Sequence, residues 1–254
     1  MHRRFQINKM NNHIKIDIKN RKIFKDKPLL EKIYYDYFKI VKKNLNLQLK
    51  GSILEIGSSG FIKKIIPQCK TSNLEKSDSM IDMEENVYSL SIKKNSISNL
   101  ILIDIFHHLE FPKFALKNMH NVLVSGGQII MIEPAMGLIP RVIYKLFHHE
   151  PNGFDFDIKW NTIPKSIPNK KQYYAAQAIP WRAFIKNELN LDSKFKLQKV
   201  RCFSDFAFLC SGGFSHKSFY PSNFYKFIKL VDNILTRISF KIFSARMLIV
   251  LKKI

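Results

Sequence analysis

The stretch SILEIGSSGFIKKII, residues 52–66, decides the fold class of the chain. It opens with a short apolar run that is typical of a buried strand, and it closes with a helical pattern that Pro67 ends. Between them lies a small-residue turn from Gly57 to Gly60, where a ligand can lie against bare backbone. A strand, a tight turn and a helix open a βαβ unit, so we expect an α/β fold.

Downstream of this stretch, strands and helices continue to alternate. Residues 100–106 are nearly all apolar and β-branched, as a central parallel strand covered on both faces would be. A helix is expected from Pro112 to Leu123, and residues 128–134 form a second buried-strand pattern that ends in a proline. This alternation predicts a mostly parallel sheet with helices on both faces.

Two segments depart from this alternation. Residues up to about Phe24 are polar and basic with no clear period, whereas residues 28–41 predict a helix, with Asp26 just before its N-terminus. Residues of about 151–180 hold several prolines and aromatics, which indicates an irregular insertion.

The end of the chain predicts a helix after Ser222 that runs into a last strand over residues 247–251. No linker rich in Pro, Gly and Ser divides the chain, so we expect one folded unit. It comprises an N-terminal basic segment with a capping helix over residues 1–50, and a main domain over residues 51–254. The insertion in the main domain is expected over about residues 138–185.

The composition is that of a folded and strongly basic protein. Of 254 residues, 46% are apolar, which excludes a disordered chain and allows a sizeable core. The net charge of +22 attracts polyanions, whether nucleic acid, an anionic membrane surface or a phosphorylated substrate. Lysines recur along the whole chain, so a charge dispersed over the surface is the alternative, and the charge alone assigns no partner.

Cysteine spacing and hydropathy limit the kinds of site and the cellular location that we expect. The three cysteines show no CxxC spacing, so we expect neither a disulfide scaffold nor a metal site. No apolar stretch follows the basic start, and no run approaches the length that crosses a bilayer. We therefore expect a cytoplasmic protein. The C-terminal helix, with Lys226, Lys229 and Arg237 among its polar positions, predicts either a solvated face or peripheral contact with the inner face of an anionic membrane.

Beyond these patterns, the sequence resembles class I methyltransferases that use S-adenosylmethionine (SAM). Residues 53–61 look like their motif I, and residues 106–127 and 132–134 are similar to their signature after the fourth strand and at the fifth. Residues 148–151 and 177–181 resemble a methyltransferase type 11-like branch that is often associated with bacterial surface-polysaccharide gene clusters. The GxGxxG dinucleotide fingerprint and the GxxxxGK[ST] phosphate loop are both absent.

The resemblance implies a Rossmann-like fold with a mostly parallel seven-stranded sheet, an antiparallel C-terminal strand, and SAM as cofactor. Asn73 stands where family members usually have an acidic residue that accepts the ribose hydroxyls, and Asn86 stands where an aspartate often contacts adenine. Motif I also has fewer glycines than the family pattern. The implied cofactor-binding residues are Glu55, Gly57, Ser58, Ser59, Gly60, Asn73, Asn86, Asp104, Phe106 and His107.

Candidates for acid–base chemistry follow a helix pattern that begins near residue 139. His148, His149 and Glu150 place imidazoles beside a carboxylate, a pairing that can take a proton from an acceptor hydroxyl. Two alternatives stay open for the aromatic residues of the insertion, which line an acceptor pocket or form the insertion's own core. These aromatic candidates are Tyr173, Tyr174 and Trp181.

The resemblance leads us to expect a SAM-dependent methyltransferase that acts on a small molecule or on a glycan of surface-polysaccharide biosynthesis, with in-line transfer to oxygen or nitrogen. One alternative is a non-catalytic relative that keeps the fold as a binding or scaffold module, in line with the altered motif I, Asn73 and Asn86. A second alternative is a nucleic-acid methyltransferase, which the charge favours. The sequence predicts neither the acceptor nor the oligomeric state.

Overall fold

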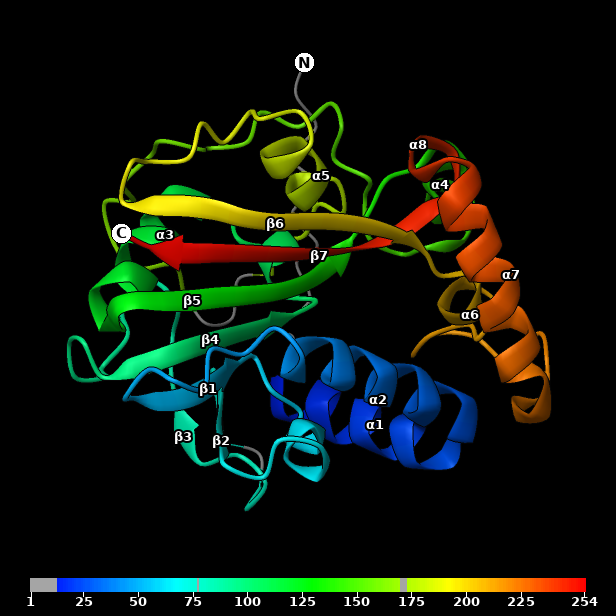
Figure 1. The fold of residues 1–254 in the computed structure, drawn as a ribbon, viewed down its shortest axis with the longest axis horizontal. Coiled ribbons are helices and arrows are strands. Elements are labelled where there is room, and N and C mark those ends of the chain that lie inside the picture. Colours follow the sequence, from blue (N-terminus) through cyan, green and yellow to red (C-terminus); the bar gives the residue numbers. More distant parts are fainter. Residues whose placement is uncertain (1–12, 77, 170–172) are drawn as a thin grey trace.

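The chain folds around one sheet, whose strands follow the order β3-β2-β1-β4-β5-β7-β6 (Figure 1). The computed structural model describes residues 13–76, 78–169 and 173–254, so residues 1–12 of the expected basic segment lie outside the described part. Strands β1 to β5 run parallel, whereas β7 runs antiparallel to both β5 and β6. The strands are β1 Ser52–Ile56, β2 Cys69–Asn73, β3 Met83–Glu84, β4 Ile97–Ile103, β5 Leu123–Pro134, β6 Phe195–Ser204 and β7 Ser244–Lys253.

Helices cover both faces of this sheet. One face packs against α1 and α2, and the other packs against α3 and α5. A second group of helices, α4, α6, α7 and α8, gathers at the right-hand end of the molecule in Figure 1. The helices are α1 His13–Asp26, α2 Pro28–Lys42, α3 Pro112–Val122, α4 Leu138–Phe147, α5 Ile179–Phe184, α6 Phe206–Leu209, α7 Tyr225–Ile238 and α8 Phe240–Phe243.

Strand β4 lies at the centre of the sheet and is buried along its whole length. Successive side chains of a strand point to opposite faces. Leu100 and Leu102 therefore join the core beneath α3 and α5, whereas Ile101 and Ile103 join the core beneath α2. This confirms a central parallel strand with two covered faces. Because β1, β4 and β5 are parallel neighbours, their carboxyl ends meet at one edge of the sheet.

The expected fold class is confirmed: the sheet is seven-stranded and mostly parallel within the described residues, with an antiparallel C-terminal strand and helices on both faces. The insertion is irregular as expected, since residues 148–169 and 173–178 form neither helix nor strand. Among the residues that the structure describes, no helix is both long enough and apolar enough to cross a membrane.

The N-terminal segment differs from expectation, because residues 13–26 form the helix α1. Contacts with distant residues stabilise it, and these leave little periodic signal in the sequence. The Phe24 ring stacks on Phe61 with centroids 4.0 Å apart, and Arg21 pairs with Asp78 as well as with Asp17 one turn before it in the helix. Asp26 ends this helix and does not cap α2, whose N-cap position is Lys27.

Strand β6 was the element hardest to predict from the sequence. It pairs with β7 alone and lies at the edge of the sheet, where five of its ten residues are exposed and most of those are polar. An edge strand of this kind lacks the continuous apolar run of the central strands. The segment after Gly60 also differs, since Phe61–Lys64 is a short 3₁₀ helix.

A buried carboxylate fastens α7 to the end of β6. Asp232 accepts hydrogen bonds from the Ser204 hydroxyl (2.9 Å) and from the backbone N–H groups of Phe206 (2.7 Å) and Ala207 (3.1 Å). It is 1% exposed. Asp232 thus holds the inner side of the helix through three hydrogen bonds.

Replacing this carboxylate is expected to loosen α7. In Asp232→Ala, the three donors lose their acceptor inside the protein, so we expect the free energy of unfolding to fall by about 3 kcal/mol. Urea denaturation followed by circular dichroism measures this change. Asn233→Ala, the exposed neighbour on the same helix, is the control and should change stability by less than about 0.5 kcal/mol. Equal stability of the two variants would contradict the role of Asp232.

Candidate functional site

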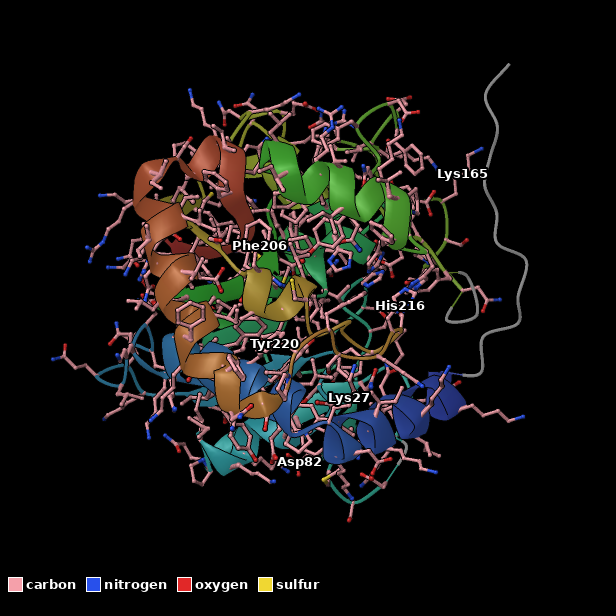
Figure 2. All side chains as sticks on the ribbon, turned by 90° about the vertical axis from the view of Figure 1, so that its right-hand side faces the viewer. Lys27, Asp82, Lys165, Phe206, His216 and Tyr220 are labelled. Carbon is pink, nitrogen blue, oxygen red and sulfur yellow. The ribbon has the colours of Figure 1, made fainter. Side chains whose placement is uncertain are left out.

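The candidate site lies where β1, β4 and β5 end, which is the edge at which open α/β sheets bind ligands. This edge is at the right of the sheet in Figure 1, and Figure 2 views the molecule from that side. The turn after β1, the segment after β4 and the end of β5 together supply most of the residues that the sequence predicted for the cofactor.

The turn after β1 is held closed by hydrogen bonds within itself. Gly57 and Gly60 have φ values of +70° and +86°, which glycine adopts without the strain that other residues meet. The Ser58 hydroxyl donates to the Glu55 carboxylate and accepts from the Gly60 N–H at 2.8 Å. The Ser58 N–H donates to the carbonyl of Ser72 on β2 at 2.8 Å. Glu55 thereby anchors the turn through the Ser58 hydroxyl.

The surface of Gly57 is covered by a side chain from the segment after β4. A Cβ at Gly57 would lie 2.1 Å from Cδ1 of Ile105, so the isoleucine occupies the space that the missing side chain leaves. Ile105 is itself only half-buried. A ligand that contacts Gly57 therefore needs the end of one flexible side chain to rotate away, with no change in the backbone.

Asn73 and Asn86 lie on the same side of the sheet, on β2 and after β3. The Asn73 amide donates to the Ser58 carbonyl at 3.2 Å, and its oxygen accepts from the Leu74 N–H at 2.8 Å. The Asn86 oxygen accepts from the Tyr88 N–H at 3.0 Å. Both residues are half-buried, as is Ser59 within the turn. Their amides hold the local backbone, and a second lone pair on each oxygen stays open to a donor.

Burial shifts the ionisation of Glu55. Removal from water raises its pKa from 4.5 to about 7, although the hydrogen bond from Ser58 acts in the opposite direction. The folded carboxyl therefore keeps its proton over a pH range in which the unfolded one has lost it. The free energy of unfolding falls as the pH rises from 4.5 towards 7.

Substitution of Glu55 by glutamine tests this linkage. Glu55→Gln keeps an oxygen that accepts from Ser58 but cannot ionise, so its stability is expected to change less with pH. Between about pH 4.5 and pH 8, the stability of the variant relative to the native chain should rise by about 3 kcal/mol. Denaturation at both pH values measures this, with Glu75→Gln as the control. A constant difference between variant and native chain at the two pH values would refute the assignment.

The carboxylate of Glu133, at the end of β5, organises the segment after β4. It accepts hydrogen bonds from the backbone N–H groups of Ile105 (2.9 Å), Phe106 (2.7 Å) and His107 (3.4 Å). It also lies 2.8 Å from Nδ1 of His107 and is fully buried. Sequence analysis quoted this glutamate only as part of a signature. A charged residue within an otherwise apolar strand was the signal that could have identified it.

His107 is a buried cation between two carboxylates. Its Nε2 lies 3.6 Å from Glu150, opposite the contact to Glu133. Burial alone would lower its pKa, but the two carboxylates outweigh that effect and raise it from 6.5 to about 10. Its contribution to stability is complete below pH 6.5 and is lost as the pH rises through about 10. His107 therefore serves as a counter-ion and not as a proton acceptor near neutral pH.

The three predicted acid–base residues have different environments. Glu150 is buried and accepts from Tyr173 and Gln177. Its burial favours the neutral form, but the neighbouring histidines hold its pKa well below the usual range. His148 accepts the Glu150 N–H on Nδ1 at 3.1 Å, and burial lowers its pKa to about 4. In that neutral tautomer the proton is on Nε2, so the ring has no free lone pair. His149 is exposed.

His108 is the ring whose lone pair is free to accept. Its Nδ1 donates to the Tyr174 carbonyl at 3.0 Å, and burial lowers its pKa to about 4, so the ring is neutral with Nε2 unprotonated. The ring stacks near His107 and Tyr173, with centroid distances of 4.0 and 5.3 Å. The sequence-based set of cofactor-binding residues contains His107 and not His108.

Nuclear magnetic resonance of the histidine rings distinguishes these states. At about pH 8 we expect a protonated ring for His107, whereas the rings of His108 and His148 should be neutral even at about pH 6. Ring ¹⁵N shifts measured across this range, with His107→Gln to assign the signal, provide the test. A His107 ring that titrates near its ordinary value of 6.5 would show that the two carboxylates do not hold the proton.

Asp104 is engaged by two residues that sequence analysis did not select. Its carboxylate pairs with the buried guanidinium of Arg246 on β7 and accepts from the Tyr34 hydroxyl at 3.0 Å. Its φ of +56° is in the left-handed region. The Asp104 side chain remains 24% exposed, so it can still contact a ligand. Among the described residues, Nε of Arg246 and the Tyr144 hydroxyl are buried without a hydrogen-bond partner.

The three predicted acceptor-side aromatics have different environments. Trp181 is buried in the core beneath α5, with its ring 6.5 Å from that of Phe240. The Tyr173 hydroxyl donates to Glu150, and the backbone of Tyr174 holds His108. Trp181 therefore packs in the core of the sheet, and a role of the three aromatics in acceptor binding stays a prediction.

In the described part of the chain, two groups of three side chains at this edge could ligate a metal, but both include the protonated ring of His107. His107 and Glu150 approach His108 in one group, and His107 and Glu133 approach Asp104 in the other. Both groups contain His107, which would have to give up the proton that the two carboxylates favour before it could bind a metal.

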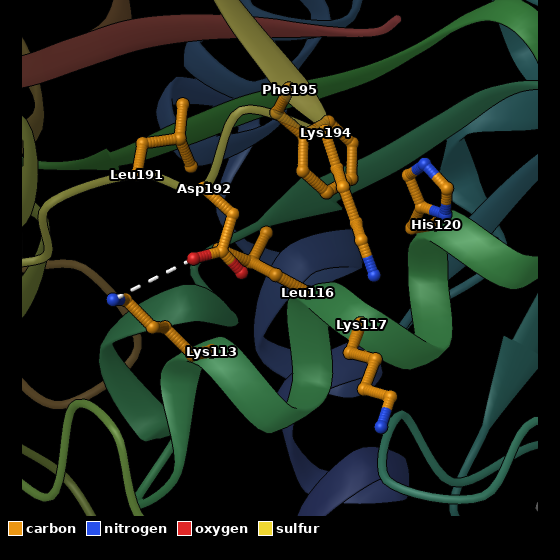
Figure 3. Close-up of a pocket in the computed structure, with 8 residues that line it drawn as sticks. All are labelled: Lys113, Leu116, Lys117, His120, Leu191, Asp192, Lys194 and Phe195. Carbon is orange, nitrogen blue, oxygen red and sulfur yellow. Dashed lines mark ion pairs between the residues drawn. The ribbon is translucent and has the colours of Figure 1, made fainter.

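A separate pocket lies away from this edge (Figure 3). It is lined by Lys113, Leu116, Lys117, His120, Leu191, Asp192, Lys194 and Phe195. It is formed by α3 and the beginning of β6, near the amino ends of the parallel strands. Lys113 and Asp192 pair across it at 3.8 Å. Its position separates it from the residues that the sequence predicted.

Comparison with known proteins identifies the fold. Neither a family model nor a curated protein matches this sequence. The structure is similar to that of a SAM-dependent methyltransferase from Thermotoga maritima described as a possible histamine N-methyltransferase, with a TM-score of 0.53, 14% identity, and coverage of 95% of this chain and 99% of that one.

A second similar structure is a complex of the Haloferax volcanii methyltransferase activator Trm112 with a methyltransferase. Its TM-score is 0.52 at 8% identity, and the match covers 96% of each chain. At these identities the likeness establishes the fold of SAM-dependent methyltransferases and leaves activity, cofactor and acceptor to be argued from the site.

Proposed function

We propose that this protein is a SAM-dependent methyltransferase that acts on oxygen or nitrogen of a small molecule or of a glycan such as a surface-polysaccharide precursor. The observation that carries the proposal is the union of this sheet order with a glycine turn at the end of β1. The turn opens onto the edge at which folds of this class bind nucleotides. The activity and its acceptor class rest on this geometry and on the resemblance of the sequence.

The residues at the edge are compatible in kind with SAM. Gly57 leaves backbone bare for the cofactor once Ile105 has rotated, whereas Gly60 packs against Met80 and shapes the turn. The amide oxygens of Asn73 and Asn86 can each accept one hydrogen bond, from a ribose hydroxyl and from an adenine amine. Nε of Arg246 is a buried donor without a partner among the described residues, close to the partly exposed Asp104. When bound, SAM supplies the activated methyl group and its leaving group.

The protein's own contribution is alignment. Glu133 fixes the backbone of residues 105–107, so the segment that faces the turn is held rigidly. Nε2 of His108 can accept a hydrogen bond from an acceptor hydroxyl or amine and orient its lone pair towards the methyl group. With a pKa of about 4, His108 is a weak base, which suits an acceptor that loses its proton late.

A non-catalytic relative is the second candidate, and one observation favours it. Ile105 covers Gly57, and the Asn73 amide is spent on the backbone of the turn. If the isoleucine keeps this position, SAM has no access to the turn, and the chain would serve as a binding or scaffold module.

Calorimetric titration with SAM separates the two candidates. We expect the native chain to bind SAM in the micromolar range and Ile105→Ala to bind at least as tightly, because the side chain over Gly57 is removed. Gly57→Ala should lose measurable binding, since its Cβ strains a φ of +70° and projects into Ile105.

Gly126→Ala is the matched control. It also places a Cβ at a positive φ, +72°, but at the start of β5, where the nearest atom would be 3.6 Å away. Its binding of SAM should equal that of the native chain. Failure of both the native chain and Ile105→Ala to bind millimolar SAM would overturn the cofactor assignment and support the non-catalytic candidate.

A further inference from the structure

The outer side of α7 is apolar although it faces solvent. Phe227, Leu230, Ile234 and Ile238 recur at helical spacing and are each more than half exposed. They lie on the side opposite Asp232, which faces the protein. An amphipathic helix normally turns its apolar stripe inwards. In α7, a second apolar stripe is left without a partner among the described residues.

Helix α4 also turns an apolar stripe towards solvent. Pro140 and Tyr144 are the residues that this helix buries, whereas Leu138, Val142 and Leu146 form an exposed stripe on the other side. Leu146 is 67% exposed, more than most apolar side chains of the protein.

The two stripes lie at the same end of the molecule. The short helix α8 contacts both α4 and α7 and adds the exposed side chains of Phe240 and Ile242. Figure 2 looks onto this end, with α4 and α7 both on the near side. We call the exposed apolar side chains of these three helices the apolar face. Scattered apolar residues on a surface are ordinary, but a grouping drawn from three adjacent helices marks a binding surface.

Charge indicates what binds there. Arg141 and Lys145 are exposed beside the stripe on α4, and Lys226 and Arg237 are exposed beside the stripe on α7. Lys241 adds a cation on α8. The structure describes every residue of these helices, and their sole carboxylate, Asp232, is buried. The exposed charges of the apolar face are therefore all positive.

We propose that the apolar face of α4, α7 and α8 docks on an anionic lipid membrane. Aromatic and aliphatic side chains flanked by lysine and arginine suit the boundary between headgroups and acyl chains, where the stripe enters the apolar layer and the cations meet anionic headgroups. A second copy of this chain fits less well, because the same cations would face each other across a symmetric interface. The proposal is independent of SAM binding.

Flotation with lipid vesicles tests this docking on the full chain. Binding is expected to vesicles of phosphatidylcholine that contain about 30% phosphatidylglycerol, and to be weak on phosphatidylcholine alone. Raising the salt to about 1 M should reduce the binding, because charge contributes to it.

Two sets of substitutions separate the apolar and electrostatic contributions. Leu146→Ser with Leu230→Ser removes two exposed anchors and should weaken vesicle binding by at least roughly tenfold. Lys145→Glu, Lys226→Glu and Lys241→Glu together should weaken it by roughly 100-fold or more. All five side chains are exposed, so the variants should keep their circular dichroism spectra.

Matched controls lie at the opposite end of the sheet. Leu47→Ser with Ile254→Ser removes two equally exposed apolar side chains, and Lys93→Glu, Lys94→Glu and Lys117→Glu reverse three exposed charges. Vesicle binding should be unchanged in the first control and reduced far less in the second than in the helix variant.

Three results would overturn the proposal. They are absence of binding to anionic vesicles, equal loss in the charge variant and its control, and full binding by the double serine variant. Analytical ultracentrifugation adds a fourth. A dimer that the double serine variant converts to monomer, without vesicle binding, would assign the apolar face to a second copy of the chain.

Discussion

The carboxylate of Glu133 is the interaction on which the candidate site depends. It is fully buried and receives three backbone N–H groups from the segment after β4, together with the ring of His107. The contacts of His107 with Glu133 and Glu150 raise the pKa of its ring to about 10, so the ring keeps its proton near neutral pH. The other ring nitrogen of His107 lies 3.6 Å from Glu150, and this contact joins the insertion to the segment after β4. One anion at the end of β5 thereby sets the backbone over the glycine turn and the position of the insertion.

Much of the fold was predictable because its central strands are covered on both faces. Residues 100–103 and 129–132 are continuous apolar runs, because both faces of these strands are buried. The turn from Gly57 to Gly60 was equally evident, because positive φ values restrict the residues that it accepts. The sequence also allowed the prediction that the candidate residues lie at one edge of the sheet, because the carboxyl ends of parallel strands meet there.

The remainder was hidden because it depends on contacts between distant parts of the chain. Nothing local shows that Arg246 pairs with Asp104, or that His107 sits between carboxylates that lie 26 and 43 positions along the chain. His148 and Glu150 looked like a base beside its carboxylate, yet the backbone N–H of Glu150 takes the lone pair of His148. Helix α1 and strand β6 were not predicted for the same reason, because tertiary packing stabilises both without a strong local period.

Helix α4 links the candidate site to the apolar face along the chain. Helix α4 begins four residues after Pro134, so the helix that carries one apolar stripe starts directly beyond the strand that ends in Glu133. Tyr144, on the inner side of that helix, senses the charges of Arg246 and Asp104 at the edge of the sheet. Among the described residues, the Tyr144 hydroxyl has no hydrogen-bond partner, so the helix that carries part of the apolar face also buries an unsatisfied polar group near the charges of the candidate site.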